Sequence, residues 1–233
     1  MEPFIGILML DTTFPRILGD IGNPHTFDFP VRKKLVAGAT VDRVVLKADP
    51  ELLEPFIRAG LELAQGGAVA LATSCGFLAL FHKELTAALP IPIFTSSLLS
   101  VHLAATLLKP GQKVGILTAR KASLTPRHLA GVGMGGSIPI AIQGMEGARE
   151  FTEVFINGKS TLDREACEKE MENAAKALIT AHPEVGPIVL ECTNMPPYAP
   201  AIRQITGRPV FDITTLLNTA AQSLMGPIPA GLE

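Results

Sequence analysis

The sequence predicts an α/β protein whose two similar lobes face each other across a cleft. Two stretches carry this prediction, residues 69–77 (VALATSCGF) and 188–195 (IVLECTNM), since each is a run of β-forming apolar residues that stops at a cysteine. A buried parallel strand has this composition, and the turn after it presents side chains at the carboxyl edge of the sheet, where ligands bind. Because one stretch lies in each half of the chain, we expect Cys75 and Cys192 to share a cleft.

The composition narrows the class of protein. Of the 233 residues, 47% are hydrophobic and 18% are charged, which suffices for one sizeable core or for two small lobes. A formal net charge of −2 without a basic run, together with one Tyr and no Trp, argues against nucleic acid as a partner. No stretch reaches the roughly 18 apolar residues that a membrane span needs, so we expect no membrane partner.

Two further observations bear on the compartment and on metals. The apolar run at residues 1–10 lacks a positively charged start and a small-residue cleavage site, so we interpret it as a first strand rather than a signal peptide. The three cysteines are an odd number without metal-ligand spacing, unlike a disulfide framework or a zinc site. We therefore expect a reduced, cytoplasmic protein without a metal.

The first half of the chain alternates strand and helix patterns, as a helix-covered parallel sheet requires. A strand over 4–10 ends at Asp11, which is either a residue of the carboxyl-edge site or an ordinary turn or cap residue. The Pro- and Gly-containing segment 14–40 reads as an irregular lid, from which Arg16 and Asn23 could reach a ligand. The remaining expected elements are a strand over 41–46, a helix from Asp49-Pro50 to Gln65, a strand from Val69, a helix over 78–89 and a strand over 93–95.

The second half repeats this plan. The glycine-rich run 131–136 is predicted to be a loop and not a phosphate-binding loop, because it lacks a Gly-Lys-Ser/Thr ending and follows no strand directly. Cys167 lies on the apolar face of a long helix, which favours a core position without chemistry. The expected elements are helices over 101–108, 161–182 (capped by Ser160 or Thr161) and 214–225, and strands over 113–118, 138–142, from Ile188 and over 209–213.

The two cysteines are suited to acid–base chemistry. A thiol at the amino end of a helix meets free backbone N–H groups and the positive end of the helix dipole, which favour the thiolate and lower its pKa from about 8.5 toward neutrality. The same N–H groups can hold the carboxylate or enolate of a substrate. With one cysteine on each face of a carbon acid, one thiolate removes a proton and the opposite thiol supplies one, so the carbon is inverted without a cofactor.

Four motifs occur in order along nearly the whole chain: Met9-Leu-Asp11, Thr73-Ser-Cys75-Gly, Val114-Gly-Ile-Leu-Thr118 and Glu191-Cys192-Thr193-Asn194. In this order they resemble the aspartate/glutamate racemase superfamily, which includes hydantoin racemases, maleate isomerases and arylmalonate decarboxylases. The resemblance implies two pseudo-symmetric lobes, each a parallel sheet flanked by helices, with the closing helix returning to the first lobe. The lobes would then be residues 1–97 with 214–233, carrying Asp11 and Cys75, and residues 98–213, carrying Thr118 and Cys192.

The resemblance also implies roles for individual residues. Cys75 and Cys192 would transfer protons without pyridoxal phosphate or any other cofactor, and Asp11 would orient or tune the site. Thr118, Thr193 and Asn194 would line the pocket, and the protein would be a homodimer or larger homo-oligomer.

Two departures from the family pattern bear on the substrate. Cys75 is followed by Gly76-Phe77, where amino-acid racemases of the family commonly have Asn-Thr, and Cys192 is followed by Thr193-Asn194, where glutamate racemases have Thr-His. The first change removes polar side chains and the second removes an imidazole, and both argue against glutamate. A less polar substrate, held mainly by backbone N–H groups, fits better.

The sequence therefore predicts a racemase or epimerase acting on the carbon α to a carboxylate or imide carbonyl of an amino acid, a hydantoin or a related acid. The alternatives are a decarboxylase or a cis–trans isomerase of the same superfamily and, in another class, a protein that binds a small anion without catalysis. Ser74 and Glu191 precede the cysteines and should face away from the site by strand alternation. The expected catalytic residues are Cys75 and Cys192, and the expected substrate-binding residues are Asp11, Gly76, Phe77, Thr95, Ser96, Thr118, Thr193 and Asn194.

Overall fold

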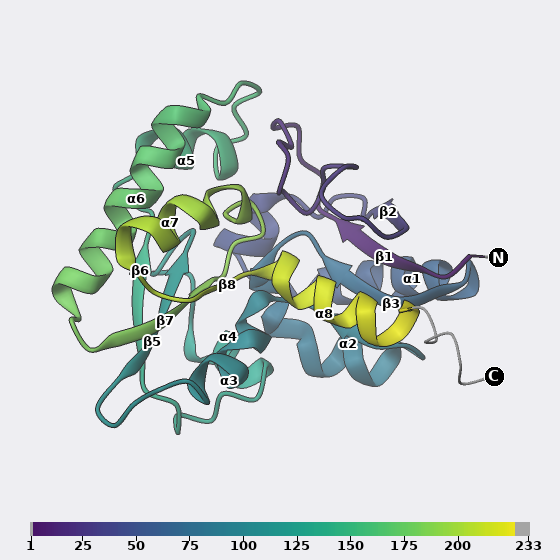
Figure 1. The fold of residues 1–233 in the computed structure, drawn as a ribbon. Helices are drawn as coiled ribbons and strands as arrows, with labels where there is room; N and C mark the ends of the chain where they lie inside the picture. Colours follow the sequence, from purple (N-terminus) through teal and green to yellow (C-terminus); the bar gives the residue numbers. More distant parts are fainter. Residues whose placement is uncertain (1, 227–233) are drawn as a thin grey trace.

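The computed structural model describes residues 2–226 and contains two four-stranded parallel sheets, each flanked by helices (Figure 1). Both sheets have the same spatial order, β2-β1-β3-β4 in the first and β6-β5-β7-β8 in the second. This arrangement confirms the predicted two-lobed α/β fold, whereas the lobe boundaries stay a prediction. The strands are β1 (Phe4–Met9), β2 (Val31–Leu35), β3 (Ala68–Thr73), β4 (Ile93–Phe94), β5 (Lys113–Thr118), β6 (Ile140–Gly144), β7 (Val185–Leu190) and β8 (Val210–Phe211).

Helices cover both faces of the sheets, which explains why the central strands β1, β3, β5 and β7 are almost continuously apolar and buried. The helices are α1 (Leu53–Gln65), α2 (His82–Ala88), α3 (Ser100–Ala105), α4 (Pro126–Gly131), α5 (Arg149–Phe155), α6 (Arg164–Ala181), α7 (Ala199–Thr206) and α8 (Ile213–Met225). Short 3₁₀ turns precede four of them, at Pro50–Leu52, Gly76–Phe81, Ser97–Leu99 and Pro196–Tyr198.

The closing helix α8 follows the second sheet in the chain but packs on the first. Ile213 and Leu217 lie in one buried cluster with Ile7 of β1 and Ala72 of β3, and Ala221 packs against the same two strands. In Figure 1, α8 (yellow) runs from the end of β8 across to the first lobe. The two lobes are thus joined by the C-terminal helix as well as by the chain between β4 and β5.

The second strand differs from the prediction. The expected strand over 41–46 is wrong, since Asp42–Leu46 forms a short π-helical turn, and the strand is β2, inside the segment predicted to be irregular. β2 lies at the edge of its sheet and has the sequence VRKKL, so it shows no apolar signature. Val44 and Val45 of this run are buried in the helical turn, whereas Leu46 is exposed, and periodicity cannot separate a strand from a helical turn in so short a run.

Several helix boundaries also differ. The long helix α6 begins at Arg164 with Asp163 as its cap, so the predicted caps Ser160 and Thr161 are wrong. The expected helix over 78–89 is a 3₁₀ turn followed by α2, and the strand expected over 138–142 is shifted to β6. The short helices α4, α5 and α7 were not predicted, because six to eight residues are too few to show a helical period. Cys167 is fully buried in α6, as predicted.

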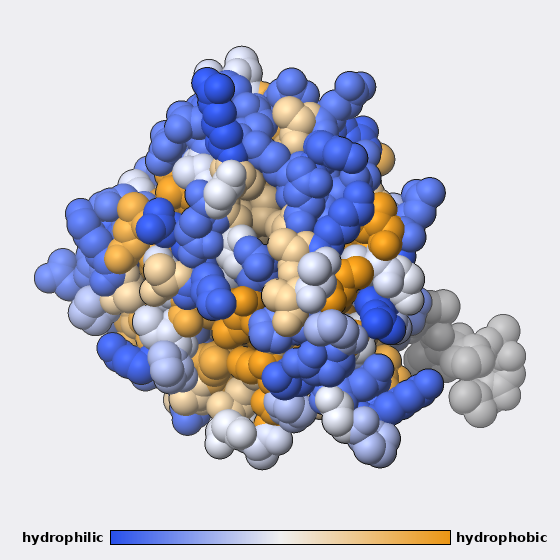
Figure 2. Space-filling view, turned by 90° about the vertical axis from the view of Figure 1, so that its left-hand side faces the viewer, coloured by the Kyte–Doolittle hydropathy of each residue, from blue (hydrophilic) through white to orange (hydrophobic). Residues whose placement is uncertain are grey.

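Charged and polar side chains cover much of the face shown in Figure 2, and apolar side chains gather in its lower half. Six large apolar side chains are exposed in the described part of the chain: Leu18, Leu35, Leu46, Leu103, Leu107 and Leu224. The predicted homo-oligomer stays a prediction. Within residues 2–226, no helix combines the length and apolarity needed to cross a membrane.

The N-terminal cap of α8 should contribute measurably to the free energy of unfolding. Asp212 is 2% exposed, and its Oδ1 accepts hydrogen bonds from the N–H groups of Thr214 (2.8 Å) and Thr215 (3.0 Å). Asp212→Ala leaves these donors without an acceptor and should lower the free energy of unfolding by about 1–2 kcal/mol in urea denaturation. Asp212→Asn keeps the acceptor and should lose much less, whereas equal losses in both variants would show that the cap is not the cause.

Candidate active site

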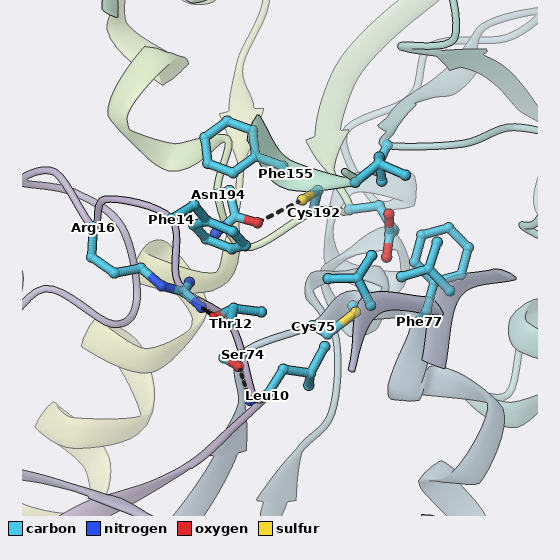
Figure 3. A pocket seen from close by; sticks show the side chains of 16 residues that line it. Leu10, Thr12, Phe14, Arg16, Ser74, Cys75, Phe77, Phe155, Cys192 and Asn194 are labelled. Atoms are coloured by element: carbon cyan, nitrogen blue, oxygen red, sulfur yellow. Dashed lines mark hydrogen bonds between the residues drawn. The ribbon is translucent and has the colours of Figure 1, made fainter. Parts of the chain in front are cut away.

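Cys75 and Cys192 line one pocket between the carboxyl ends of the two sheets. Cys75 follows β3 and caps the Gly76–Phe81 turn, and Cys192 follows β7. Figure 3 shows the two cysteines entering the pocket from opposite sides. The pocket is nearly closed in this structure, since its cavity volume is about 20 Å³, close to what one water molecule needs.

The pocket walls are mainly apolar, with a few polar groups among them. Such a lining favours a ligand with an apolar body and a small number of polar contacts. No group of three or more His, Cys, Asp or Glu side chains within residues 2–226 is placed to hold a metal ion. Besides the cysteines and Gly76, the polar residues of the lining are Thr12, Arg16, Ser74, Glu191 and Asn194, and the apolar ones are Leu10, Phe14, Val41, Val45, Phe77, Ala119, Phe155 and Ile156.

Hydrogen bonds across the lobes hold the two cysteine-bearing strand ends together. The hydroxyl of Thr193, next to Cys192, donates to the carbonyl oxygen of Ser74, next to Cys75, at 2.6 Å. From the first lobe, the Ser97 hydroxyl donates to the carbonyl oxygen of Leu190, the last residue of β7. Thr193 and Ser97 are fully buried, so these bonds are shielded from water.

A second network links the irregular segment after β1 to Cys192. The Arg16 guanidinium donates to Asp20 (3.0 Å) and Thr12 (2.9 Å), and it lies 4.4 Å above the Phe14 ring. The Asn194 amide donates to Asp20 (2.7 Å) and its oxygen faces the Cys192 thiol at 3.5 Å. This segment therefore forms one wall of the pocket, as expected of a lid.

Asp20 was not identified from the sequence, and Asn23 does not take the position expected of it. Asp20 is 2% exposed and joins both halves of the network, yet nothing in its local sequence distinguishes it from a turn residue. The Asn23 side chain donates to the Arg16 carbonyl oxygen at 2.7 Å and is not part of the pocket lining. Asn23 thus helps to fix the conformation of the segment after β1.

Glu191 is the largest departure from the predicted site. It was expected to face away from Cys192, but its carboxyl group is fully buried and lines the pocket. Its Oε2 accepts a hydrogen bond from Thr118 at 2.8 Å, and its Oε1 has no hydrogen-bond partner among residues 2–226. A Cβ atom at position 76 would lie 2.2 Å from Oε1, so only glycine fits beside this carboxyl group.

Burial dominates the electrostatics of the thiols. It raises the pKa of Cys75 to about 12 and raises the pKa of Cys192 well above its ordinary value, and the Glu191 carboxylate adds to both shifts. The Phe77 N–H and the Arg16 charge lower the pKa of Cys75, but by less. The expectation that helix-end N–H groups bring both thiol pKa values toward neutrality is therefore wrong. Both thiols hold their protons at rest.

The other predicted substrate-binding residues fall into two groups. Gly76, Phe77 and Asn194 line the pocket with the cysteines. Thr118 and Thr193 do not, and bond to Glu191 and Ser74 instead.

Three predicted residues lie further from the cysteines. The Thr95 hydroxyl pairs with His82 Nδ1 at 2.9 Å, and the Ser96 hydroxyl caps the Ser97–Leu99 turn. Asp11 is exposed at the end of β1, beside a neighbouring hollow. None of these three is part of the pocket lining, so the prediction that they contact the ligand there does not agree with the geometry.

Comparison with protein families matches residues 39–221 to the Asp/Glu/Hydantoin racemase family. A dimethylsulfoniopropionate lyase of Durusdinium sp. clade D is 30% identical over 215 residues, which cover 89% of this chain and 70% of that protein. Dimethylsulfoniopropionate lyase 6 of Emiliania huxleyi is 29% identical over 232 residues, which cover 96% of this chain and 60% of that protein. The chain thus spans less than two thirds of this second relative.

Solved structures share the fold at low sequence identity. A glycine-to-cysteine mutant of arylmalonate decarboxylase with an associated sulfate ion aligns with a TM-score of 0.66 at 17% identity, over 99% of this chain and 95% of that chain. The aspartate racemase of Picrophilus torridus aligns with a TM-score of 0.57 at 15% identity, over 94% of this chain and 93% of that chain. At these identities the likeness establishes the fold alone.

The burial of Glu191 predicts a pH-dependent stability. Burial raises the pKa of this carboxyl group to about 7, so the folded protein holds a proton that the unfolded chain releases near pH 4.5. The resulting stabilisation is present below pH 4.5 and is lost as the pH rises through 7, a change of about 3 kcal/mol. Glu191→Gln cannot ionise, so urea denaturation should find it increasingly more stable than the wild type between pH 5 and pH 8.

Glu165→Gln, on the exposed face of α6, is the control for loss of a carboxyl group. A stability difference between Glu191→Gln and the wild type that stays constant over this pH range would contradict the raised pKa of Glu191.

Proposed function

Because the chain belongs to the Asp/Glu/hydantoin racemase family, we propose that it catalyses proton transfer, without a cofactor, at the carbon α to a carboxylate or imide carbonyl of a small substrate. One observation carries the proposal: two thiols, one after a strand of each sheet, line the same small pocket. Family membership supports it, and so does the buried hydrogen bonding that holds both strand ends in place.

The reaction begins when one thiolate removes the α-hydrogen as a proton. The electron pair of the C–H bond moves into the substrate's carbonyl group as an enolate, and the N–H groups of the Gly76–Phe81 turn can stabilise the negative charge. The opposite thiol then donates its proton to the other face of the carbon. The sulfur that took the proton ends as a thiol and its partner ends as a thiolate, so charge and protons balance and the carbon is inverted.

Cys75 is the better candidate for the first base. The Arg16 cation and the Phe77 N–H favour its thiolate, whereas the Cys192 thiol faces the oxygen of Asn194 and lies near Asp20. A thiol of raised pKa ionises less often, but its thiolate is a stronger base once formed. The site therefore suits a weakly acidic α-hydrogen.

The pocket lining supports racemisation or epimerisation of a substrate with a mainly apolar body. Phe14, Phe77 and Phe155 supply aromatic walls, and the backbone N–H groups of the Gly76–Phe81 turn could hold a carboxylate. Amino acids, hydantoins and related acids contain the required α-hydrogen beside a carbonyl group.

A second candidate is β-elimination, and the two relatives named dimethylsulfoniopropionate lyases favour it. Its first step is the same removal of an α-proton by a thiolate. The electron pair then forms a Cα–Cβ double bond while the bond from Cβ to sulfur breaks, and dimethyl sulfide leaves with the bonding electrons to give acrylate. Release of the sulfide with acrylate identifies this reaction, whereas inversion without loss of a group identifies racemisation.

Deuterium exchange tests the proposed chemistry. Chiral amino acids, hydantoins and dimethylsulfoniopropionate are incubated with the enzyme in heavy water, and mass spectrometry follows deuterium at the α-carbon and any product released. We expect turnover of at least one substrate class by the wild type and a loss of about 100-fold or more in Cys75→Ser and in Cys192→Ser. Cys167→Ala, in the core of α6, is the matched control and should retain the rate.

Wild-type rates in both serine variants would contradict the role of the cysteines. A ligand that binds without exchange or product formation would instead indicate the non-catalytic anion-binding protein.

A further inference from the structure

The carboxyl group of Glu191 is buried at the pocket wall without a positive charge beside it. Its side chain is fully buried, the Thr118 hydroxyl donates to Oε2, and the Ala119 N–H lies beside the carboxyl group; both of these groups are uncharged. Oε1 has no hydrogen-bond partner, and no Lys, Arg or His within residues 2–226 pairs with this carboxyl group. Every other deeply buried carboxylate of the pocket region is paired, since Asp20 binds Arg16 and Asn194.

An unpaired buried carboxylate is costly, so such a group is either protonated or waits for a positive partner. The charged and titratable groups around Glu191 offer no such partner. Cys75 and Cys192 hold protons, the Arg16 charge is taken by Asp20 at 3.0 Å, and His128, which stacks on Phe77, is neutral because burial lowers its pKa to about 4.

We propose that Glu191 is the binding subsite for a positively charged substituent of the substrate, either an ammonium group or an alkylated onium group. The inference rests on the proposed function only in taking this pocket as the substrate site. Recognition then has two poles: the substrate's carboxylate meets the N–H groups of the Gly76–Phe81 turn, and its cation meets Glu191. The substrate class is a small zwitterion.

The surroundings of Oε1 suit both kinds of cation. Oε1 is buried against Gly76, and any side chain at this position would collide with it. An ammonium group can donate a hydrogen bond to Oε1, which has none in the described structure. An alkylated onium group has no N–H to donate, but the aromatic rings of Phe77 and Phe155 in the same lining can attract it by cation–π contact.

If Glu191 binds a cation, the affinity for a zwitterion should rise with pH. Burial raises the pKa of Glu191 to about 7, and a bound cation favours the ionised carboxylate. A zwitterion should therefore bind about tenfold more tightly at pH 8 than at pH 6, with release of a proton at the lower pH. A carboxylate of the same shape that lacks the cation should gain no affinity from the rise in pH.

Pairs of isosteric ligands test the subsite by calorimetry. The ammonium arm compares alanine with isobutyrate, and the onium arm compares 3-(trimethylammonio)propionate with 4,4-dimethylpentanoate. In the wild type, at least one zwitterion should bind about tenfold or more tightly than its isosteric partner without the cation, and the arm in which it does so identifies the kind of cation. Glu191→Gln keeps the size of the side chain and an acceptor for Thr118, and it should abolish this preference and its pH dependence.

Each remaining outcome overturns the inference. If neither zwitterion is preferred by the wild type, or if Glu191→Gln retains the preference within twofold, Glu191 does not bind a cation. Because the measurement is of binding, it does not depend on catalysis by the cysteines. Failure of the subsite leaves deuterium exchange intact, and failure of exchange in the wild type leaves the binding preference intact.

Discussion

The 2.6 Å hydrogen bond from the Thr193 hydroxyl to the Ser74 carbonyl oxygen is the contact on which the site depends most directly. It joins the residue after Cys192 to the residue before Cys75, in a position that water does not reach. Each sheet on its own would present one thiol at its carboxyl edge, as open α/β sheets commonly present ligand-binding residues. The bond between the two edges makes them one pocket, and the contact between Ser97 and Leu190 reinforces it.

The same close approach sets the electrostatics of the site. Joining the two sheet edges buries Cys75 and Glu191 and leaves Cys192 partly exposed, and burial raises the pKa of all three groups. The pocket is therefore nearly neutral at rest, although it contains three groups that can ionise. Such a site stabilises a thiolate, an enolate or a carboxylate only when the substrate brings a positive charge. The substrate that the pocket recognises therefore affects how readily the cysteines ionise.

Much of this arrangement is visible in the sequence, and the exceptions have physical causes. The strands before Cys75 and Cys192 are predictable because both faces are buried, which makes them continuously apolar. Strand β2 is not, because an edge strand tolerates charged residues. Glu191 was misplaced because strand alternation ends with β7 at Leu190, so the period of two no longer applies one residue later.

The network of Arg16, Asp20 and Asn194 is beyond local sequence patterns altogether. Asp20 and Asn194 belong to different halves of the chain and meet only after both lobes have folded and docked. Thr95 was predicted to bind the ligand because it follows a strand at the carboxyl edge of the sheet, but its hydroxyl group pairs with His82 instead. Position at the carboxyl edge of a sheet thus marks a residue as a candidate, and the partners of its side chain decide whether a ligand can reach it.

The central claim, that two thiols from different lobes face one small pocket, can be tested directly with dibromobimane, which becomes fluorescent when both of its arms have alkylated thiols. The account predicts a single fluorescent adduct that links the peptides containing Cys75 and Cys192, with Cys167 unmodified in the folded protein. Two separate single-arm adducts, or a link that includes Cys167, would contradict it.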